Sequence, residues 1–151
     1  MICLCCGKPI KNEEAASCGW HHSCIKHFFG TNRLPEITIS NEALEWIANE
    51  TISKGYTVPG GQKKLSLHLT KEEKARLTLV GYPSGYILKP QTNEYRALPE
   101  AEQMIMCMAD AAGITTVPHG LIQSDGTYAY ITKRVDRMVL PDQSIRLLAM
   151  E

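Results

Sequence analysis

A two-residue period that begins after Val58 constrains the fold more than any other feature of the sequence. Leu65, Leu67 and Leu69 alternate with polar residues, which is typical of a half-buried strand. The segments RLTLV and YILK follow after short turns, and Pro90 is expected to end the third strand. Strands joined by short turns are usually antiparallel neighbours. The sequence therefore predicts an antiparallel sheet over the middle of the chain.

Two helices are expected beside this sheet. Ser40 is a candidate N-cap for a helix over residues 41–54, where apolar residues recur at helical spacing. A second helix is expected to begin at Pro99 and to end with Gly113 as its C-cap. Because its middle, residues 104–109, carries no charge, we expect this second helix to be well buried.

Two more strand-like segments, LIQ and YAYITKR, flank the turn at Ser124, Asp125 and Gly126. They bring the predicted strands to five. The predicted fold class is α+β: an antiparallel sheet of about five strands with a packed helix, preceded by a small segment rich in cysteine and histidine.

Composition excludes several classes of protein. The 16 lysines and arginines equal the 16 aspartates and glutamates, so no strong basic charge argues for nucleic-acid binding. No apolar run approaches the roughly 20 residues that cross a bilayer, and the N-terminus lacks the apolar segment of a secretory signal. Five of the six cysteines crowd into the first 24 residues, unlike a secreted disulfide framework. We therefore expect a cytoplasmic protein with reduced thiols.

The cysteine cluster predicts a structural zinc site. Cys3 and Cys6 form C-x-x-C, and His21 and Cys24 form H-x-x-C, so two short turns offer four ligands to one tetrahedral ion. Four protein ligands leave no open position for a substrate, so the ion would be structural. Two alternatives stay open. Other nearby residues could replace one ligand, namely Cys5, Cys18 and His22, or the cluster is simply a group of free thiols and surface histidines.

A second candidate site combines a glycine turn, a strand lysine and a helix carboxylate. Gly60 and Gly61 allow backbone N–H groups to approach a phosphate, and Gln62 and the lysines after it add donors and charge. Lys89 ends an apolar strand, where its charge is costly unless paired, and Glu102 is the natural partner. The alternatives are an ordinary hairpin turn, a lysine in solvent and a glutamate that serves the helix dipole.

This order of motifs resembles the HipA-like serine/threonine kinases, the toxin half of bacterial toxin–antitoxin modules. The resemblance runs through VPGGQKKLSL, YILKP, the Glu102 helix, AAGITTVP and YITKRVDR. The N-terminal C-x-x-C, WHHSC and KHFFGT resemble a subgroup with a zinc-knuckle-like start. The resemblance implies transfer of the ATP γ-phosphate to a protein serine or threonine, with magnesium. It also implies a HipB-like antitoxin as partner and, for some members, an aminoacyl-tRNA synthetase as substrate.

The resemblance assigns site residues by position. Thr57 matches a serine that family members autophosphorylate as an off switch. Lys133 replaces an acidic residue that is common in the family, so we expect any adenine contact there from backbone groups. The residues expected to contact ATP are Val58, Gly60, Gly61, Gln62, Lys64, Lys89, Glu102, Lys133 and Val135.

The catalytic-loop aspartate, the asparagine and the magnesium-binding aspartate of the family have no match in the chain. We therefore expect residues 1–30 to form the knuckle-like segment and residues 31–151 an N-terminal ATP-binding lobe that is inactive alone. The alternative is a stand-alone zinc-knuckle module that binds an antitoxin or a separate kinase half and exposes an apolar face. Direct nucleic-acid binding is not expected, because the first 30 residues carry few basic groups.

Overall fold

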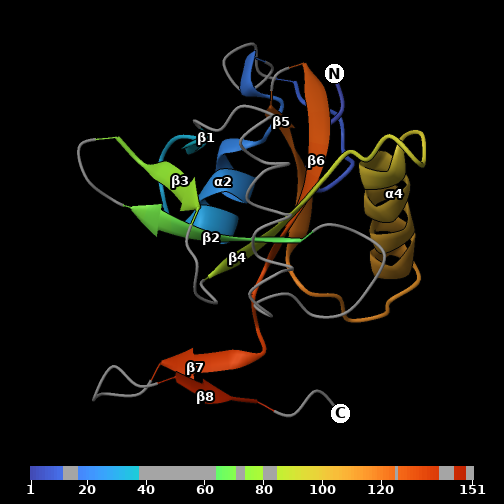
Figure 1. Ribbon diagram of the computed structural model, residues 1–151. Coiled ribbons are helices and arrows are strands. Elements are labelled where there is room, and N and C mark those ends of the chain that lie inside the picture. Colours follow the sequence, from blue (N-terminus) through green and yellow to red (C-terminus); the bar gives the residue numbers. More distant parts are fainter. Residues whose placement is uncertain are drawn as a thin grey trace.

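The computed structural model describes residues 1–11, 17–37, 64–70, 74–79, 85–124, 126–139 and 145–148 (Figure 1). Several predicted features lie outside these residues: the helix over residues 41–54 with its N-cap Ser40, the phosphorylation candidate Thr57, and Val58, Gly60, Gly61 and Gln62 of the glycine segment. In the described part of the chain, no helix has the length and apolar character needed to cross a membrane.

The architecture is α+β, as predicted, and is centred on a six-stranded sheet with the order β1-β3-β2-β4-β6-β5. The strands are β1 (Glu36–Ile37), β2 (Leu65–Thr70), β3 (Arg76–Leu79), β4 (Tyr86–Pro90), β5 (His119–Ser124) and β6 (Thr127–Lys133). All neighbours are antiparallel except β1 and β3, which are parallel. The sheet is therefore mixed, because a strand precedes the five that were expected. A separate hairpin is formed by β7 (Arg137–Val139) and β8 (Ile145–Leu147).

One face of the sheet carries the hydrophobic core and is covered by α2 (His22–Phe29). Leu67 lies opposite Tyr86, and both are buried, as the alternation in β2 predicts. Phe28 and Phe29 stack on the Tyr86 ring, with centroids 5.8 and 5.5 Å from it. The Tyr86 hydroxyl donates to the Phe28 carbonyl at 3.2 Å. Phe28 and Phe29 thereby join the N-terminal segment to the main body of the protein.

The N-terminal segment also covers β5, the outer strand at the far side of the sheet. The Leu121 N–H donates to the Leu4 carbonyl at 2.8 Å, and the Trp20 indole N–H donates to the Leu121 carbonyl at 2.9 Å. These bonds satisfy backbone groups that an open sheet edge would expose. Because Trp20 also belongs to the main hydrophobic cluster, the segments before and after residue 30 share one core.

The other face of the sheet carries α4 (Leu98–Ala111), which packs over β5 and β6 (Figure 1). Pro99 lies in its first turn, as predicted. Ala112 is the C-cap, one residue earlier than expected, and Gly113 follows with φ of +79°. This left-handed conformation is one that glycine adopts without strain, so Gly113 still ends the helix.

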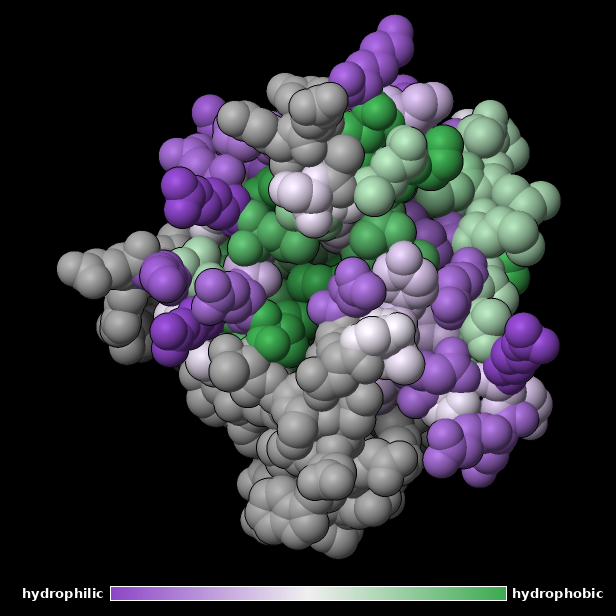
Figure 2. Space-filling view, turned by 90° about the horizontal axis from the view of Figure 1, so that it is seen from above, coloured by the Kyte–Doolittle hydropathy of each residue, from purple (hydrophilic) through white to green (hydrophobic). Residues whose placement is uncertain are grey.

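The prediction that the middle of α4 is well buried is wrong. Met104, Ile105 and Met108 are 59%, 62% and 63% exposed. In Figure 2, green (hydrophobic) residues lie at the surface on the right, the side on which α4 is seen in Figure 1. The physical reason is that α4 turns polar side chains toward the sheet, where they find polar partners. A run without charges therefore did not reveal which side of the helix faces inward.

Candidate functional site

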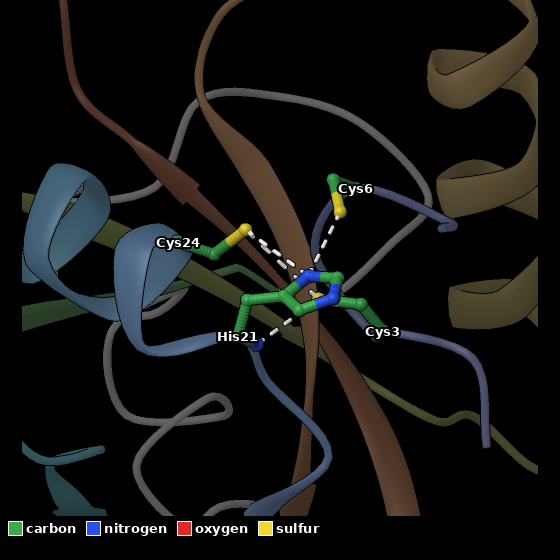
Figure 3. A group of neighbouring side chains, drawn as sticks. All are labelled: Cys3, Cys6, His21 and Cys24. Atoms are coloured by element: carbon green, nitrogen blue, oxygen red, sulfur yellow. Dashed lines mark hydrogen bonds between the residues drawn. The ribbon is translucent and has the colours of Figure 1, made fainter. Parts of the chain in front are cut away.

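The proposed zinc ligands come from two short turns that the fold brings together. Cys3 and Cys6 lie in a tight turn that is closed by the Gly7 N–H donating to the Cys3 carbonyl at 3.0 Å. Gly7 has φ of +68°, which favours glycine. His21 precedes α2, and Cys24 lies in its first turn. In Figure 3 the four side chains point toward one another from the turn and from α2.

The spacing of the four ligand atoms fits a zinc ion. All lie within 4.8 Å of one another. The Cys3 and Cys24 sulfurs are 4.0 Å apart, and His21 Nδ1 lies 3.3 Å from the Cys6 sulfur and 3.8 Å from the Cys24 sulfur. A tetrahedral zinc with Zn–S bonds of about 2.3 Å holds its sulfurs about 3.8 Å apart. The predicted ligands therefore converge, while zinc binding itself stays a prediction.

Surrounding groups prepare two of these residues, His21 and Cys3, for a cation. His21 Nε2 lies 3.2 Å from the Pro9 carbonyl, which can only accept, so Nε2 carries the proton and Nδ1 keeps its lone pair. The Cys3 sulfur accepts from the His21 backbone N–H at 3.4 Å. Although burial acts against ionisation, hydrogen bonds from backbone N–H groups of Cys6, His21 and Cys5 lower the pKa of Cys3 to about 7. Burial and the neighbouring sulfurs raise the pKa of Cys24 to about 12.

Two alternative ligands are directed elsewhere. The Cys5 thiol points to the His119 carbonyl at 3.5 Å, and burial raises its pKa. The Cys18 thiol lies 3.5 Å from the Trp20 carbonyl. Neither belongs to the group of four converging atoms, so the structure favours the ligand set that the two motifs predict.

Lys89 of β4 and Glu102 of α4 form an ion pair, as the sequence predicts. Both side chains are largely shielded from solvent. The Lys89 ammonium also lies 5.2 Å from the ring centroid of Tyr130, its neighbour on β6. Burial, followed by the nearby Glu102 charge, raises the pKa of Tyr130, so this residue stays a neutral phenol. The strand cation is thus held between a carboxylate and an aromatic face.

Lys64, which directly precedes β2, lies near Lys89 in the sheet. The register pairs Leu65 of β2 with Leu88 of β4. The start of β2, which Lys64 immediately precedes, therefore lies beside the end of β4 that carries Lys89. Two of the residues expected to contact ATP, Lys64 and Lys89, belong to the same end of adjacent strands.

Lys133 and Val135 lie farther from this pair. Lys133 pairs with Tyr86, three residues before Lys89 on β4, so its side chain is on the α2 face of the sheet. It lines a pocket of about 320 Å³ there, together with Phe29 and Tyr86. The Lys133 side chain therefore lies on the face of the sheet away from Lys89, and an adenine contact from the Lys133 backbone stays a prediction. Val135 is exposed beyond the end of β6.

A buried polar network was not found from the sequence. Gln103 of α4 donates through Nε2 to the Cys5 carbonyl at 2.8 Å, and its Oε1 lies 2.8 Å from His119 Nδ1. His119 Nε2 lies 3.0 Å from the Asp110 carboxylate, which also accepts from the Thr116 hydroxyl at 2.5 Å. A histidine at the start of an apolar strand was the available signal, because such a group needs partners when buried.

Comparison with known proteins identifies the family. The HipA-like C-terminal domain family matches residues 56–151, the larger part of the chain. The chain belongs to the HipA-like family. This HipA-like chain is 28% identical over 137 residues to a Haemophilus influenzae protein described as "Putative kinase". That match covers 86% of the chain but 38% of the relative, so the chain spans well under half of its length.

A solved structure is also similar to this HipA-like chain. It is the complex of HipA, HipB and operator DNA from the Shewanella oneidensis MR-1 toxin–antitoxin system. The similarity covers 67% of the chain and 26% of that structure's chain, with 23% sequence identity and a TM-score of 0.41.

Proposed function

We propose that this chain forms the ATP-binding lobe of a HipA-like protein serine/threonine kinase. The observation that carries the proposal is the ion pair between Lys89 of β4 and Glu102 of α4. Phosphoryl transfer depends on positioned positive charge, and a lysine fixed by a helix carboxylate is a recurring way to hold the phosphates of ATP. Membership of the HipA-like family supports this assignment of the pair.

In this proposal, different residues bind the phosphates and the adenine of ATP. Lys89 neutralises phosphate charge, Glu102 fixes its ammonium, and Lys64 adds a second cation beside it. Gly60 and Gly61 let backbone N–H groups approach the phosphates. The backbone near Lys133 and Val135 holds the adenine. Magnesium would accompany ATP, and we assign it no ligand within these 151 residues.

Activity, substrate and partner are proposed for the whole protein rather than for this chain alone. We propose that the whole protein transfers the γ-phosphate to a protein serine or threonine, for example on an aminoacyl-tRNA synthetase, in the cytoplasm. A HipB-like antitoxin is the proposed partner, and phosphorylation of Thr57 is the proposed off switch. No catalytic residue is assigned within the chain.

The zinc site has a structural part in this proposal. Cys3, Cys6, His21 and Cys24 would bind one ion, and four protein ligands leave it no position for substrate. The ion would tie the N-terminal turn to α2, the helix that supplies Phe28 to the core of the sheet. It would thereby stabilise the lobe without taking part in chemistry.

Calorimetric titration with magnesium ATP tests the nucleotide assignment. We expect saturable binding that is weakened at least about tenfold by Lys89→Ala, because a charge-assisted contact to phosphate is lost. Glu102→Gln should weaken it by a smaller factor. Lys26→Ala changes an exposed lysine on α2 and is the matched control, which should bind as the wild type does. Equal affinity of wild type and Lys89→Ala would refute the proposal.

A further inference from the structure

The polar network around Gln103 connects the zinc-knuckle turn to the helix that carries Glu102. Gln103 is 6% exposed and directly follows Glu102 on α4. Its amide bridges two other parts of the chain: Nε2 donates to the Cys5 carbonyl, and Oε1 meets His119 Nδ1, each at 2.8 Å. The two ends of one buried side chain are thus bonded to the turn and to β5.

The Cys5 carbonyl fixes the orientation of the Gln103 amide. A carbonyl only accepts, so the amide nitrogen of Gln103 must face Cys5 and its oxygen must face His119. Nδ1 of His119 contacts this oxygen, and Nε2 on the other side of the ring lies 3.0 Å from the Asp110 carboxylate. His119 thus holds α4 at two points, Gln103 and Asp110, which lie about two turns apart on the helix.

The acceptor of the Gln103 amide belongs to the metal turn. Cys5 lies between the proposed ligands Cys3 and Cys6, so an ion that fixes both also fixes the carbonyl between them. The turn is docked on β5 as well, through the Leu4 carbonyl and the Leu121 N–H at 2.8 Å. The knuckle turn is therefore connected to α4 by the hydrogen bond between the Gln103 amide and the Cys5 carbonyl.

Apolar packing contributes little to the position of α4. Among the described residues of the helix, only Pro99 and Gln103 are buried, and Met104, Ile105 and Met108 of its middle are exposed. Hydrogen bonds consequently decide how the helix is rotated. A rotation or shift of α4 would withdraw Glu102 from Lys89.

We propose that Gln103 is a positioning residue through which the zinc-knuckle turn holds Glu102 against Lys89. The knuckle then affects the charge arrangement at Lys89 through Gln103, the residue next to Glu102 on α4. The effect on ATP affinity rests on the proposed function, whereas the effect on the Lys89–Glu102 pair does not.

A chemical readout tests the proposal without nucleotide. The rate at which acetic anhydride acylates Lys89 is measured by mass spectrometry, relative to the exposed Lys26 in the same molecules. Pairing with Glu102 should slow this reaction. We expect Gln103→Leu to raise the relative rate several-fold, as Glu102→Ala does, with no further increase in the double variant. Gln123→Leu, an exposed glutamine on β5, is the matched control and should leave the rate unchanged.

A second variant guards against loss of folding. Gln103→Glu keeps an acceptor for His119 but loses the donor to the Cys5 carbonyl and to the Cys107 sulfur, so it interrupts the connection to the knuckle and keeps the one to β5. It should also raise the relative rate, by about two- to tenfold, the range expected for one net hydrogen bond. The proposal fails if both Gln103 variants fold and leave Lys89 protected, or if Gln103→Leu adds its full effect on top of Glu102→Ala. It also fails if Glu102→Ala does not expose Lys89.

The same variants separate this inference from the proposed function. If magnesium ATP binds, the affinity should fall with Gln103→Leu in the wild type but not in the Glu102→Ala background. If ATP does not bind at all, the nucleotide assignment fails, and the acylation rates still decide whether Gln103 positions the pair.

Discussion

The Trp20 indole lies directly against Gly120 of β5. A Cβ atom at residue 120 would come 2.6 Å from two carbons of the ring. Trp20 is fully buried, so the ring has little room to move. The absence of a side chain at residue 120 is therefore what lets the N-terminal segment dock on the edge of the sheet.

Gly120→Ala should destabilise the protein by about 1–3 kcal/mol, the usual cost of overpacking a core. The measurement is the free energy of unfolding from urea denaturation followed by tryptophan fluorescence. Gly85→Ala is the matched control, because a Cβ there meets nothing within 4 Å and its φ is not positive. An alanine at residue 120 that is as well tolerated as one at residue 85 would contradict this packing.

Ala97→Gly should stabilise the protein by roughly 0.5–1 kcal/mol. Ala97 is the N-cap of α4 and has φ of +54°, a left-handed conformation that strains an alanine. Ala101→Gly, in the exposed interior of the same helix, should instead cost about 1 kcal/mol. Thermal and urea unfolding of the two variants should therefore move in opposite directions. Movement of both toward lower stability would show that residue 97 is not strained.

Cobalt substitution should report the metal site. One Co²⁺ per chain should give the intense ultraviolet charge-transfer absorption of thiolate ligands together with tetrahedral visible bands. Cys3→Ser and His21→Ala should lose stoichiometric binding, since each removes one of the four converging atoms. Cys18→Ser is the control and should keep the full spectrum, because its thiol faces the Trp20 carbonyl. A spectrum that depends on Cys18 but not on Cys3 would identify a different ligand set.

The contribution of Asp110 to stability should vanish in acid. The Thr116 hydroxyl, followed by His119, holds the pKa of Asp110 below its ordinary value of 3.8. A lowered folded-state pKa stabilises the protein above the unfolded value, and this stability is lost as pH falls through the folded one. Cys107, the other titratable neighbour, has a pKa raised by burial and stays a neutral thiol in this range.

Comparison with Asp110→Asn checks this prediction. Because the Asp110 side chain is half exposed, the difference in unfolding free energy should be no more than about 1 kcal/mol at neutral pH. It should shrink as the pH falls below 3.8. A difference that grows as the pH falls would give the opposite sign and contradict the assignment.

The sequence was most informative where a periodic pattern or a costly charge left few options. Alternation at Leu65 and Leu67 predicts β2 because a strand repeats every two residues. Lys89 at the end of an apolar strand requires a partner, and only a loop separates this strand from the helix that carries Glu102. The spacing of the Cys3 and His21 pairs predicts their convergence for a similar reason, since one ion draws ligands from two turns.

The rest depended on tertiary contacts that leave no local pattern. The orientation of α4 follows from the two partners of Gln103, which are Cys5, nearly 100 residues earlier, and His119 on β5. The hydrophobicity of the helix sequence therefore gave the wrong prediction of which side is buried. The parallel pairing of β1 with β3 involves only two residues, Glu36 and Ile37, too few to form a periodic signal. Helix α2 is a short segment of eight residues whose burial on the sheet stabilises it.

The outward-facing methionines of α4 have a practical consequence for anyone who produces this polypeptide. Met104 and Met108 can be exchanged for lysine or glutamate without disturbing the inner surface of the helix, since neither contributes to the core. Protein engineering aimed at solubility should start there. A method that orients helices by burying their most hydrophobic side would instead rotate α4 so that Met104, Ile105 and Met108 faced the sheet.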